Sequence, residues 1–154
     1  MIEEKNIVLS IAYDGTNFKG WQAQKVPPVR SVEGVLVPAI EKVANHAINL
    51  MCAGRTDAGV HARNQTVNFI TNVDRSEYSW IRGINTYLPD DCAVVAVHKA
   101  PLDFHSRYSA KGRHYQYVIC NQPFKPVMSR LYATHINYPL NIENDAVGCK
   151  SLNW

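Results

Sequence analysis

The residues best suited to chemistry in this 154-residue chain form one segment, Gly54-Arg55-Thr56-Asp57-Ala58-Gly59-Val60-His61. Its glycines allow tight turns, and Asp57 supplies a carboxylate two residues after the guanidinium of Arg55. That guanidinium can pair with the carboxylate or with a phosphate. The spacing equally allows a plain turn, in which Asp57 caps a short helix and Arg55 makes a surface ion pair. A metal site is not expected, because no third ligand follows Asp57 and His61 at a suitable spacing.

Strands and helices must position this segment, and apolar periodicity predicts their order. Short β-branched or alternating runs predict strands at residues 7–13, 46–52, 65–70 and 93–97. Helical spacing predicts one helix capped by Ser31 and another capped by Ser76 and stopped by Pro89. Gly34 and Pro38 oppose the first helix by about 1 and about 3 kcal/mol, so we expect a kink or an early end. The order β-α-β-β-α-β predicts an α+β, ferredoxin-like fold, an antiparallel sheet with both helices on one face.

The C-terminal third of the chain continues this pattern. A fifth strand is expected at residues 114–120, where Tyr115, Tyr117 and Ile119 would share one face. A last helix is expected to begin at Asn141. Because the sequence contains no repeat, low-complexity stretch or linker, it predicts a single domain over residues 1–154.

Charge is divided unevenly along the chain. The formal net charge is +3, but residues 1–103 carry 10 bases and 11 acids, whereas residues 104–154 carry 6 bases and 2 acids. Aromatic residues alternate with the bases of the second part. This mixture suits RNA, because cations bind phosphates and aromatic faces stack on nucleobases. It equally suits a strand with its rings in the core and its bases in water.

Cysteine usage and hydropathy predict a cytoplasmic protein. The four cysteines, Cys52, Cys92, Cys120 and Cys149, form no Cys-x-x-Cys pair, so we expect four reduced thiols. No apolar run approaches the roughly 18 to 20 residues needed to cross a bilayer. The chain also begins with acids rather than with a cationic signal, so no membrane association is expected.

Residues 54–61, followed by Gln65, resemble the active-site motif of the tRNA pseudouridine synthase A family. Further matches to that family follow in the same order: Tyr13-Asp14-Gly15, Phe18-Lys19-Gly20-Trp21-Gln22, Ser31-Val32, Leu88-Pro89, Asp103-Phe104-His105-Ser106-Arg107, and Arg113 with Tyr115 and Tyr117. Glu33 stands where the family usually has Gln, and Asn64 where it usually has Gly. Family members continue through a second half that borders the catalytic cleft and supplies an Arg partner for the catalytic Asp. This chain is therefore expected to be an N-terminal half.

The resemblance implies that the chain isomerises uridine to pseudouridine at positions 38, 39 and 40 of the tRNA anticodon arm, without a cofactor or a metal. Asp57 is the implied catalytic carboxylate, and Arg55 would occupy the space left by the flipped nucleotide. Tyr115 would pack on the target uracil. The implied phosphate ligands are His105, Arg107 and Arg113. A cytoplasmic homodimer is also implied.

Two other interpretations stay open. One is a non-catalytic RNA-binding module, since ferredoxin-like sheets that display aromatic residues bind single strands. RNA binding that survives Asp57→Ala, without product from either protein, would favour it. The other is a degenerate fragment that does not fold alone, because its sheet would end in an open edge.

Overall fold

The structure is a computed structural model that describes residues 3–24 and 26–141. Along the chain it divides into two compact units, Met1–Ala110 and Lys111–Trp154, and each is described here by itself. The single-domain organisation expected from the sequence stays a prediction.

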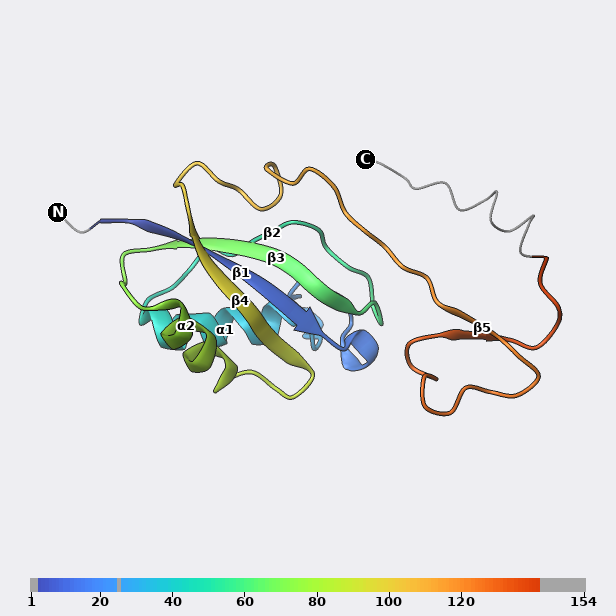
Figure 1. Cartoon of the computed structure of the whole chain (residues 1–154). Coiled ribbons are helices and arrows are strands. Elements are labelled where there is room, and N and C mark those ends of the chain that lie inside the picture. The colour runs from blue at the N-terminus through green and yellow to red at the C-terminus, as the bar shows by residue number, and fades with distance from the viewer. Residues whose placement is uncertain (1–2, 25, 142–154) are drawn as a thin grey trace. The chain divides into compact units, whose positions relative to one another are not determined.

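The first unit is a four-stranded sheet with two helices. Its strands are β1 (Lys5–Tyr13), β2 (Met51–Cys52), β3 (Ala62–Thr71) and β4 (Cys92–Ala100), and its helices are α1 (Val32–Ala44) and α2 (Glu77–Asn85). The strands lie in the order β2-β3-β1-β4, and each neighbouring pair is antiparallel. A short 3-10 turn, η1 (Gly15–Asn17), follows β1. Figure 1 shows both helices on the same side of the sheet. The predicted α+β class, with an antiparallel sheet and two helices, is confirmed.

Alternation along the two central strands produces the core. Ile7, Leu9 and Ile11 of β1 are fully buried and point to the helix side, as do Val67 and Phe69 of β3. The helices contribute their own periodic apolar residues, which are Leu36, Ile40, Trp80 and Ile84. The rings of Phe69 and Trp80 meet edge to face, with centroids 5.6 Å apart. This core rigidly supports the strand ends from which the functional loops leave.

Helix α1 begins as predicted and ends later than predicted. The Ser31 side chain accepts a hydrogen bond from Gly34 N, as expected of its cap. The helix then continues through Pro38 to Ala44, so of the two expected outcomes the early end is wrong, whereas the kink stays a prediction. Its buried apolar face explains this result, because burial of a Leu or Ile side chain contributes about 1.5–3 kcal/mol and offsets the proline.

Other boundaries also differ from the sequence prediction, since β1 begins at Lys5, β3 begins at Ala62 and β4 ends at Ala100. The second strand is only Met51–Cys52 instead of residues 46–52. His46 instead bonds to Thr71 Oγ1 through its ring at 2.7 Å, and Ile48 N donates to the Glu41 carboxylate at 3.1 Å. These contacts engage the segment before β2 with α1 and the end of β3, rather than with a strand ladder. At α2, the helix ends at Asn85, ahead of Pro89.

The second unit contains two short parallel strands, β5 (Ile119–Asn121) and β6 (Thr134–Ile136). The strand predicted at residues 114–120 is therefore wrong for residues 114–118, which form no strand. Tyr115 and Tyr117, expected on a shared face, are 75% and 77% exposed. Propensity alone does not make a strand, because a strand also needs a neighbour to accept its hydrogen bonds. The predicted helix from Asn141 lies outside the described residues, except for Asn141 itself.

Among the described residues, no helix combines the length and the apolar character that a membrane span requires. The described cysteines Cys52, Cys92 and Cys120 are free thiols, and Cys149 lies outside the described residues.

The burial of Cys92 gives a chemical prediction for the start of β4. Burial raises the pKa of the Cys92 thiol to about 12, and the nearby Asp91 carboxylate adds to the effect. Only the thiolate reacts rapidly with alkylating reagents, so Cys92 should stay protonated and unlabelled by iodoacetamide at pH 8.5. Mass spectrometry of the native protein should show the half-buried Cys120 labelled before Cys92. In urea-unfolded protein, both Cys92 and Cys120 should be labelled. Equal native rates at Cys92 and Cys120 would contradict the burial of β4.

Candidate functional site

The loop between β2 and β3, residues 53–61, carries the chemical motif of the sequence. Its first residues are bonded to β3, and its last residue leads directly into that strand. Ala53 N donates a hydrogen bond to Thr66 O at 2.9 Å, and the Gln65 side chain donates to Gly54 O. The loop therefore leaves the sheet in a fixed direction.

A second segment, residues 13–21, runs against this loop and is called the clamp segment below. The hydrogen bonds between them are Trp21 N to Thr56 O (2.9 Å), Gly59 N to Phe18 O (3.2 Å), Gly15 N to His61 Nδ1 (3.1 Å), and one between the hydroxyls of Tyr13 and Thr56 (2.8 Å). They fix the loop immediately before and shortly after Asp57. A side chain at position 57 is thus presented on a backbone that is restrained on both sides.

The close contact between clamp segment and loop requires glycine at two positions. A Cβ atom built on Gly15 would lie 2.1 Å from Val60 O, which is far inside van der Waals contact. A Cβ on Gly20 would lie 2.9 Å from Thr56 O, and Gly20 also has φ of +96°, a conformation that other residues rarely adopt. The Asp14-Gly15 turn and Gly20 are therefore part of the site, although they carry no reactive group.

Aromatic side chains anchor the clamp segment in the core. Phe18 and Trp21 are buried, and Tyr13 packs between them with both ring centroids 6.3 Å away. Burial raises the pKa of the Tyr13 hydroxyl, and its hydrogen bond with Thr56 opposes that rise. Tyr13 is accordingly a neutral hydroxyl at neutral pH, able to share a hydrogen bond with the loop.

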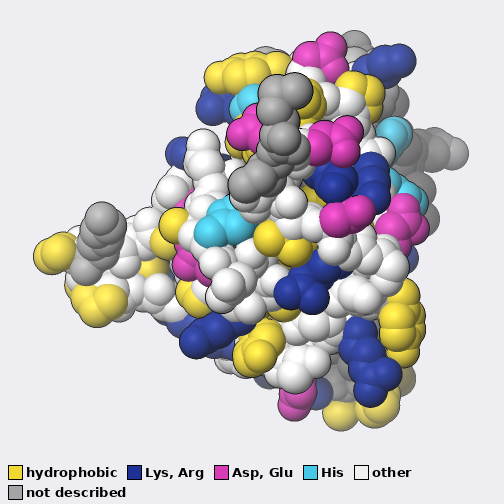
Figure 2. All heavy atoms as spheres, turned by 90° about the vertical axis from the view of Figure 1, so that its left-hand side faces the viewer, with side chains coloured by type: hydrophobic (Ala, Val, Ile, Leu, Met, Phe, Trp, Pro, Cys, Tyr) yellow, Lys and Arg dark blue, Asp and Glu magenta, His cyan; other side chains and the backbone are white. Residues whose placement is uncertain are grey.

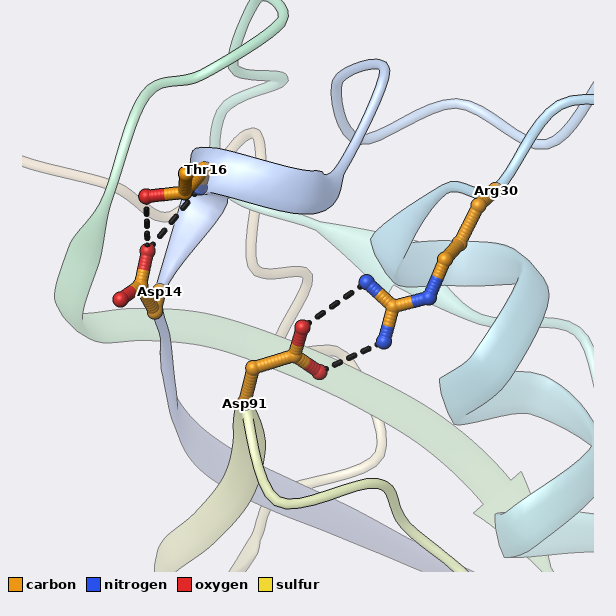
Figure 3. A network of polar contacts seen from close by, with 4 residues as sticks. All are labelled: Asp14, Thr16, Arg30 and Asp91. Atoms are coloured by element: carbon orange, nitrogen blue, oxygen red, sulfur yellow. Dashed lines mark hydrogen bonds and ion pairs between the residues drawn. The ribbon is translucent and has the colours of Figure 1, made fainter. Parts of the chain in front are cut away.

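A bidentate ion pair supports the clamp segment from the β4 side, as Figure 3 shows. The two terminal nitrogens of Arg30 donate to the Asp91 carboxylate at 2.8 and 2.6 Å. The Arg30 guanidinium also lies 4.1 Å from the centre of the Phe18 ring, and Asp91 O accepts a hydrogen bond from Asp14 N at 3.0 Å. Asp91, the residue before β4, thus contacts Asp14 of the clamp segment directly and Phe18 through Arg30.

The side chains of Arg55 and Asp57 are exposed. Within the part of the chain that the structure describes, neither makes a hydrogen bond or an ion pair. The Arg55–Asp57 pair considered from the sequence is therefore not formed, and both charged groups are available to a ligand. Asp57 does take part in the turn through its backbone, since Val60 N donates to Asp57 O at 3.2 Å.

His105 and Arg107 lie after β4 in a compact turn of the same unit. Ser109 N donates to His105 O at 2.8 Å, and Arg107 N donates to His105 Nδ1 at 3.1 Å. The ring of the exposed Tyr108 lies 4.4 Å from the His105 ring and 5.9 Å from the Arg107 guanidinium. Over the described residues, no hydrogen bond or ion pair joins this turn to the Asp57 loop.

The two remaining predicted site residues, Arg113 and Tyr115, belong to the second unit. Both side chains are exposed, and they lie in an extended segment ahead of β5. Their placement relative to Asp57 stays a prediction from the resemblance.

Charge is mixed on the face of the molecule shown in Figure 2, where basic and acidic side chains lie next to one another. Within the first unit, Asp74 lies between Lys99 (3.2 Å) and Lys5 (3.4 Å), which hold the pKa of its carboxyl below the usual range. Alternating charge of this kind does not favour a polyanion. As for metals, the described residues contain no group of three or more His, Cys, Asp or Glu side chains that could bind an ion.

Some residues that build the site were not identified as such from the sequence. Asn6 and Asn68 are buried polar residues within the two central strands, and they hold the segment that precedes Arg107. In a strand, a polar residue that alternates with buried apolar residues is predicted to face solvent. The one available signal is that amides occur at corresponding places in two adjacent strands.

Comparison with known proteins gives a consistent result. A family profile described as tRNA pseudouridine synthase matches residues 9–109. Proteins named tRNA pseudouridine synthase A are 46% identical over 135 residues in Photorhabdus laumondii and 47% identical over 137 residues in Cronobacter sakazakii. These alignments cover 88% and 89% of this chain but 50% of each relative. A relative of the same name from Shewanella sp. (strain MR-4) is 44% identical, over 95% of this chain and 55% of its own length. The chain therefore spans about half the length of the curated relatives it matches.

The close approach of clamp segment and loop can be tested at Gly15. Gly15→Ala places a methyl group against Val60 O, so the backbones must separate, at an expected cost of about 1–3 kcal/mol in the free energy of unfolding. Urea denaturation followed by tryptophan fluorescence measures this cost. Gly112→Ala is the matched control, since a Cβ at Gly112 meets nothing within 4 Å. Equal unfolding midpoints for the two variants would contradict the described contact.

Proposed function

Since this chain belongs to the tRNA pseudouridine synthase family, whose profile matches residues 9–109, we propose that it provides the catalytic half of an enzyme that isomerises uridine to pseudouridine in tRNA. The observation that carries the proposal is the loop at residues 53–61. Its backbone is restrained by the clamp segment, while the Asp57 carboxylate is exposed and unpaired among the described residues. A carboxylate in that setting is accessible to a bound nucleotide and to the Arg partner that the resemblance assigns to the second half of the family.

Asp57 is the proposed catalytic carboxylate. In its ionised form it adds to C6 of uracil or to C1′ of ribose, or it supports loss of a C2′ proton. In each route the bond between N1 and C1′ breaks, the base rotates, C5 bonds to C1′, the proton on C5 leaves and N1 takes up a proton. Any bond to Asp57 formed on the way breaks again, and a proton taken from C2′ is returned to it. Substrate and product are isomers, so the reaction consumes no oxidant, reductant or second substrate, and no cofactor is included in the proposal.

Arg55 is proposed to fill the space that the target nucleotide vacates. A uridine inside a stacked arm is out of reach, and its extrusion costs a few kcal/mol. A planar guanidinium stacks on neighbouring bases and bonds to phosphates, and the exposed Arg55 side chain lies two residues from Asp57. The absence of an Arg55–Asp57 ion pair among the described residues supports this assignment.

The proposed substrate surface extends beyond the loop. We assign phosphate contacts in the anticodon arm to His105, Arg107 and Arg113, and packing against the target uracil to Tyr115. The neighbouring ring of Tyr108 supports an RNA role for the His105 turn, because exposed aromatic and cationic groups occur together there. The proposal also includes modification at positions 38, 39 and 40, a ferredoxin-like arrangement of the sheet, a cytoplasmic location and a homodimer.

The site is proposed to need a further polypeptide, equivalent to the remaining half of the relatives. This chain spans about half of their length. The second unit also exposes large apolar side chains, among them Met128 at 92% and Phe124 at 73%. Two short strands rarely form a stable structure by themselves, so these residues are expected to pack against protein. On this view, residues 1–154 form the N-terminal half of a two-part catalytic unit.

A non-catalytic RNA-binding module is the second candidate. The exposed tyrosines of the second unit favour it, because such rings stack on single-stranded bases without any chemistry. The two candidates differ in whether Asp57 is needed for product.

The first prediction separates these candidates. With the C-terminal half of the Photorhabdus relative added, Asp57→Asn should reduce tritium release from C5-labelled tRNA at least about a thousandfold, because the amide cannot act as a nucleophile. Affinity for tRNA should stay within a few fold. Asp90→Asn, which makes the same charge change at another exposed aspartate, should leave turnover unchanged. Turnover by the Asp57 variant would exclude Asp57 as the catalytic group, whereas binding without turnover in every protein would favour the module.

The second prediction concerns completeness. We expect tritium release by residues 1–154 to be low alone and to rise when the C-terminal half of the Photorhabdus relative is added in excess. The same addition to the Asp57→Asn chain is the control and should produce no release. Full turnover by the 154-residue chain alone would show that the other half is dispensable.

A further inference from the structure

Two asparagines lie side by side on the sheet face opposite the helices. Asn6 of β1 and Asn68 of β3 alternate with the buried core residues of their strands, so they point away from the core. The register pairs Val8 with Asn68 and Asn6 with Ile70, which makes the two asparagines diagonal neighbours. Both are nevertheless buried, with 1% and 0% exposure.

The segment after β4 buries them. Figure 1 shows this segment crossing the sheet on the side opposite the helices. Asn6 Nδ2 donates to Pro101 O at 2.9 Å and to Phe104 O at 2.8 Å. Asn68 Oδ1 accepts from Ser106 N at 2.9 Å and from the Ser106 hydroxyl. The asparagine side chains thus take the place of water as hydrogen-bond partners of residues 101–106, a segment without regular secondary structure.

The two amides are also bonded to each other. Asn68 Nδ2 donates to Asn6 Oδ1 at 2.9 Å and approaches Phe104 O at 3.4 Å. Each amide therefore uses its oxygen and its nitrogen within one network. A fully satisfied buried network fixes the geometry of its members, whereas an incomplete one is costly. A substitution at Asn68 should accordingly change the position of Ser106.

Ser106 lies between His105 and Arg107, the side chains assigned to RNA phosphates. Ser106 is 2% exposed, whereas Arg107 is exposed. Fixing the backbone at Ser106 consequently fixes the point from which Arg107 extends. The hydrogen bonds from Ser109 N to His105 O and from Arg107 N to His105 Nδ1 carry this constraint through the turn.

We infer that Asn68, together with Asn6, is a positioning residue for RNA binding: it anchors Ser106 so that His105 and Arg107 meet the substrate backbone in a fixed geometry. The inference rests on the proposed function. It adds an RNA-binding role for two side chains that are themselves inaccessible to RNA.

The test compares Asn68→Ala with Thr71→Val in the complete 154-residue chain. Thr71 is the matched control, because it is a buried polar residue of the same strand that bonds to His46 and Val73 and not to residues 101–106. The probe is an anticodon stem-loop RNA labelled for fluorescence anisotropy, under conditions in which denaturation curves show each variant folded. We expect Asn68→Ala to weaken binding about tenfold, and Thr71→Val to change it less than twofold.

A double-mutant comparison with His105 and Arg107 distinguishes a positioning role of Asn68 from a general loss of stability. If Asn68 acts through the turn, then Asn68→Ala should cost less than twofold in binding when introduced into a His105→Ala/Arg107→Ala chain. The same tenfold loss in that background, or no loss in the parent background, would overturn the inference. Should Asn68→Ala fail to fold, Ser106→Ala is judged by the same coupling, because it removes one hydroxyl from a segment outside the sheet.

Failure of the proposed function gives a different result. An unmodified chain that does not bind the RNA, even with the other half added, would contradict that function. Amide hydrogen exchange would then test, without RNA, whether Asn68 anchors the segment at Ser106. Faster exchange at residues 106–109 in Asn68→Ala, but not in Thr71→Val, supports it, and equal exchange overturns it.

Discussion

The position of Asp57 depends on two backbones that approach each other more closely than side chains allow. At Gly15 and Gly20 the clamp segment contacts the carbonyls of Val60 and Thr56, and the hydrogen bonds of Trp21 and Gly59 follow from that proximity. A loop held by main-chain atoms does not depend on side-chain contacts, so the Asp57 side chain can stay exposed while its backbone is restrained. The buried Phe18 and Trp21, and the Arg30–Asp91 pair behind them, stabilise the clamp segment rather than the loop itself. The backbone position of Asp57 is therefore stabilised by residues that lie away from it and carry no reactive group at the site.

The same sheet positions a second group of residues by a different physical means. On its helix side, Ile7, Leu9 and Phe69 are held by apolar packing, which is not a directional interaction. On the other side, Asn6 and Asn68 hold the segment after β4 by directed hydrogen bonds. Apolar packing could bury that segment as well, but it would tolerate sliding, since it has no preferred register. Directional bonds suit a segment whose task is to present two side chains at a defined place.

The sequence predicted what depends on local pattern and missed what depends on distant partners. The strand at residues 7–13 and the helices after Ser31 and Ser76 were found because alternation, helical period and caps are encoded within a few residues. Residues 114–118 have the alternation of a strand but no neighbouring strand within this chain's described part, and pattern alone does not reveal that. The helix through Pro38 was underestimated for the same reason, because its stability comes from packing. At the site, the chemical groups of residues 54–61 were evident, whereas their contact with Gly15 and Gly20 is a property of the fold.

The two units differ in how far they satisfy their own interactions, and this difference has a consequence for catalysis. The first unit encloses its core, its clamp and its asparagine network using its own residues. The second leaves Tyr115, Tyr117 and Met128 largely in water around a two-stranded ribbon. Under the proposed function, a partner polypeptide would order Tyr115 and its neighbours, whereas the first unit holds the Asp57 loop with its own hydrogen bonds. Assembly of the proposed site would then cost entropy mainly in the second unit, because the backbone of the Asp57 loop is already restrained within the first unit.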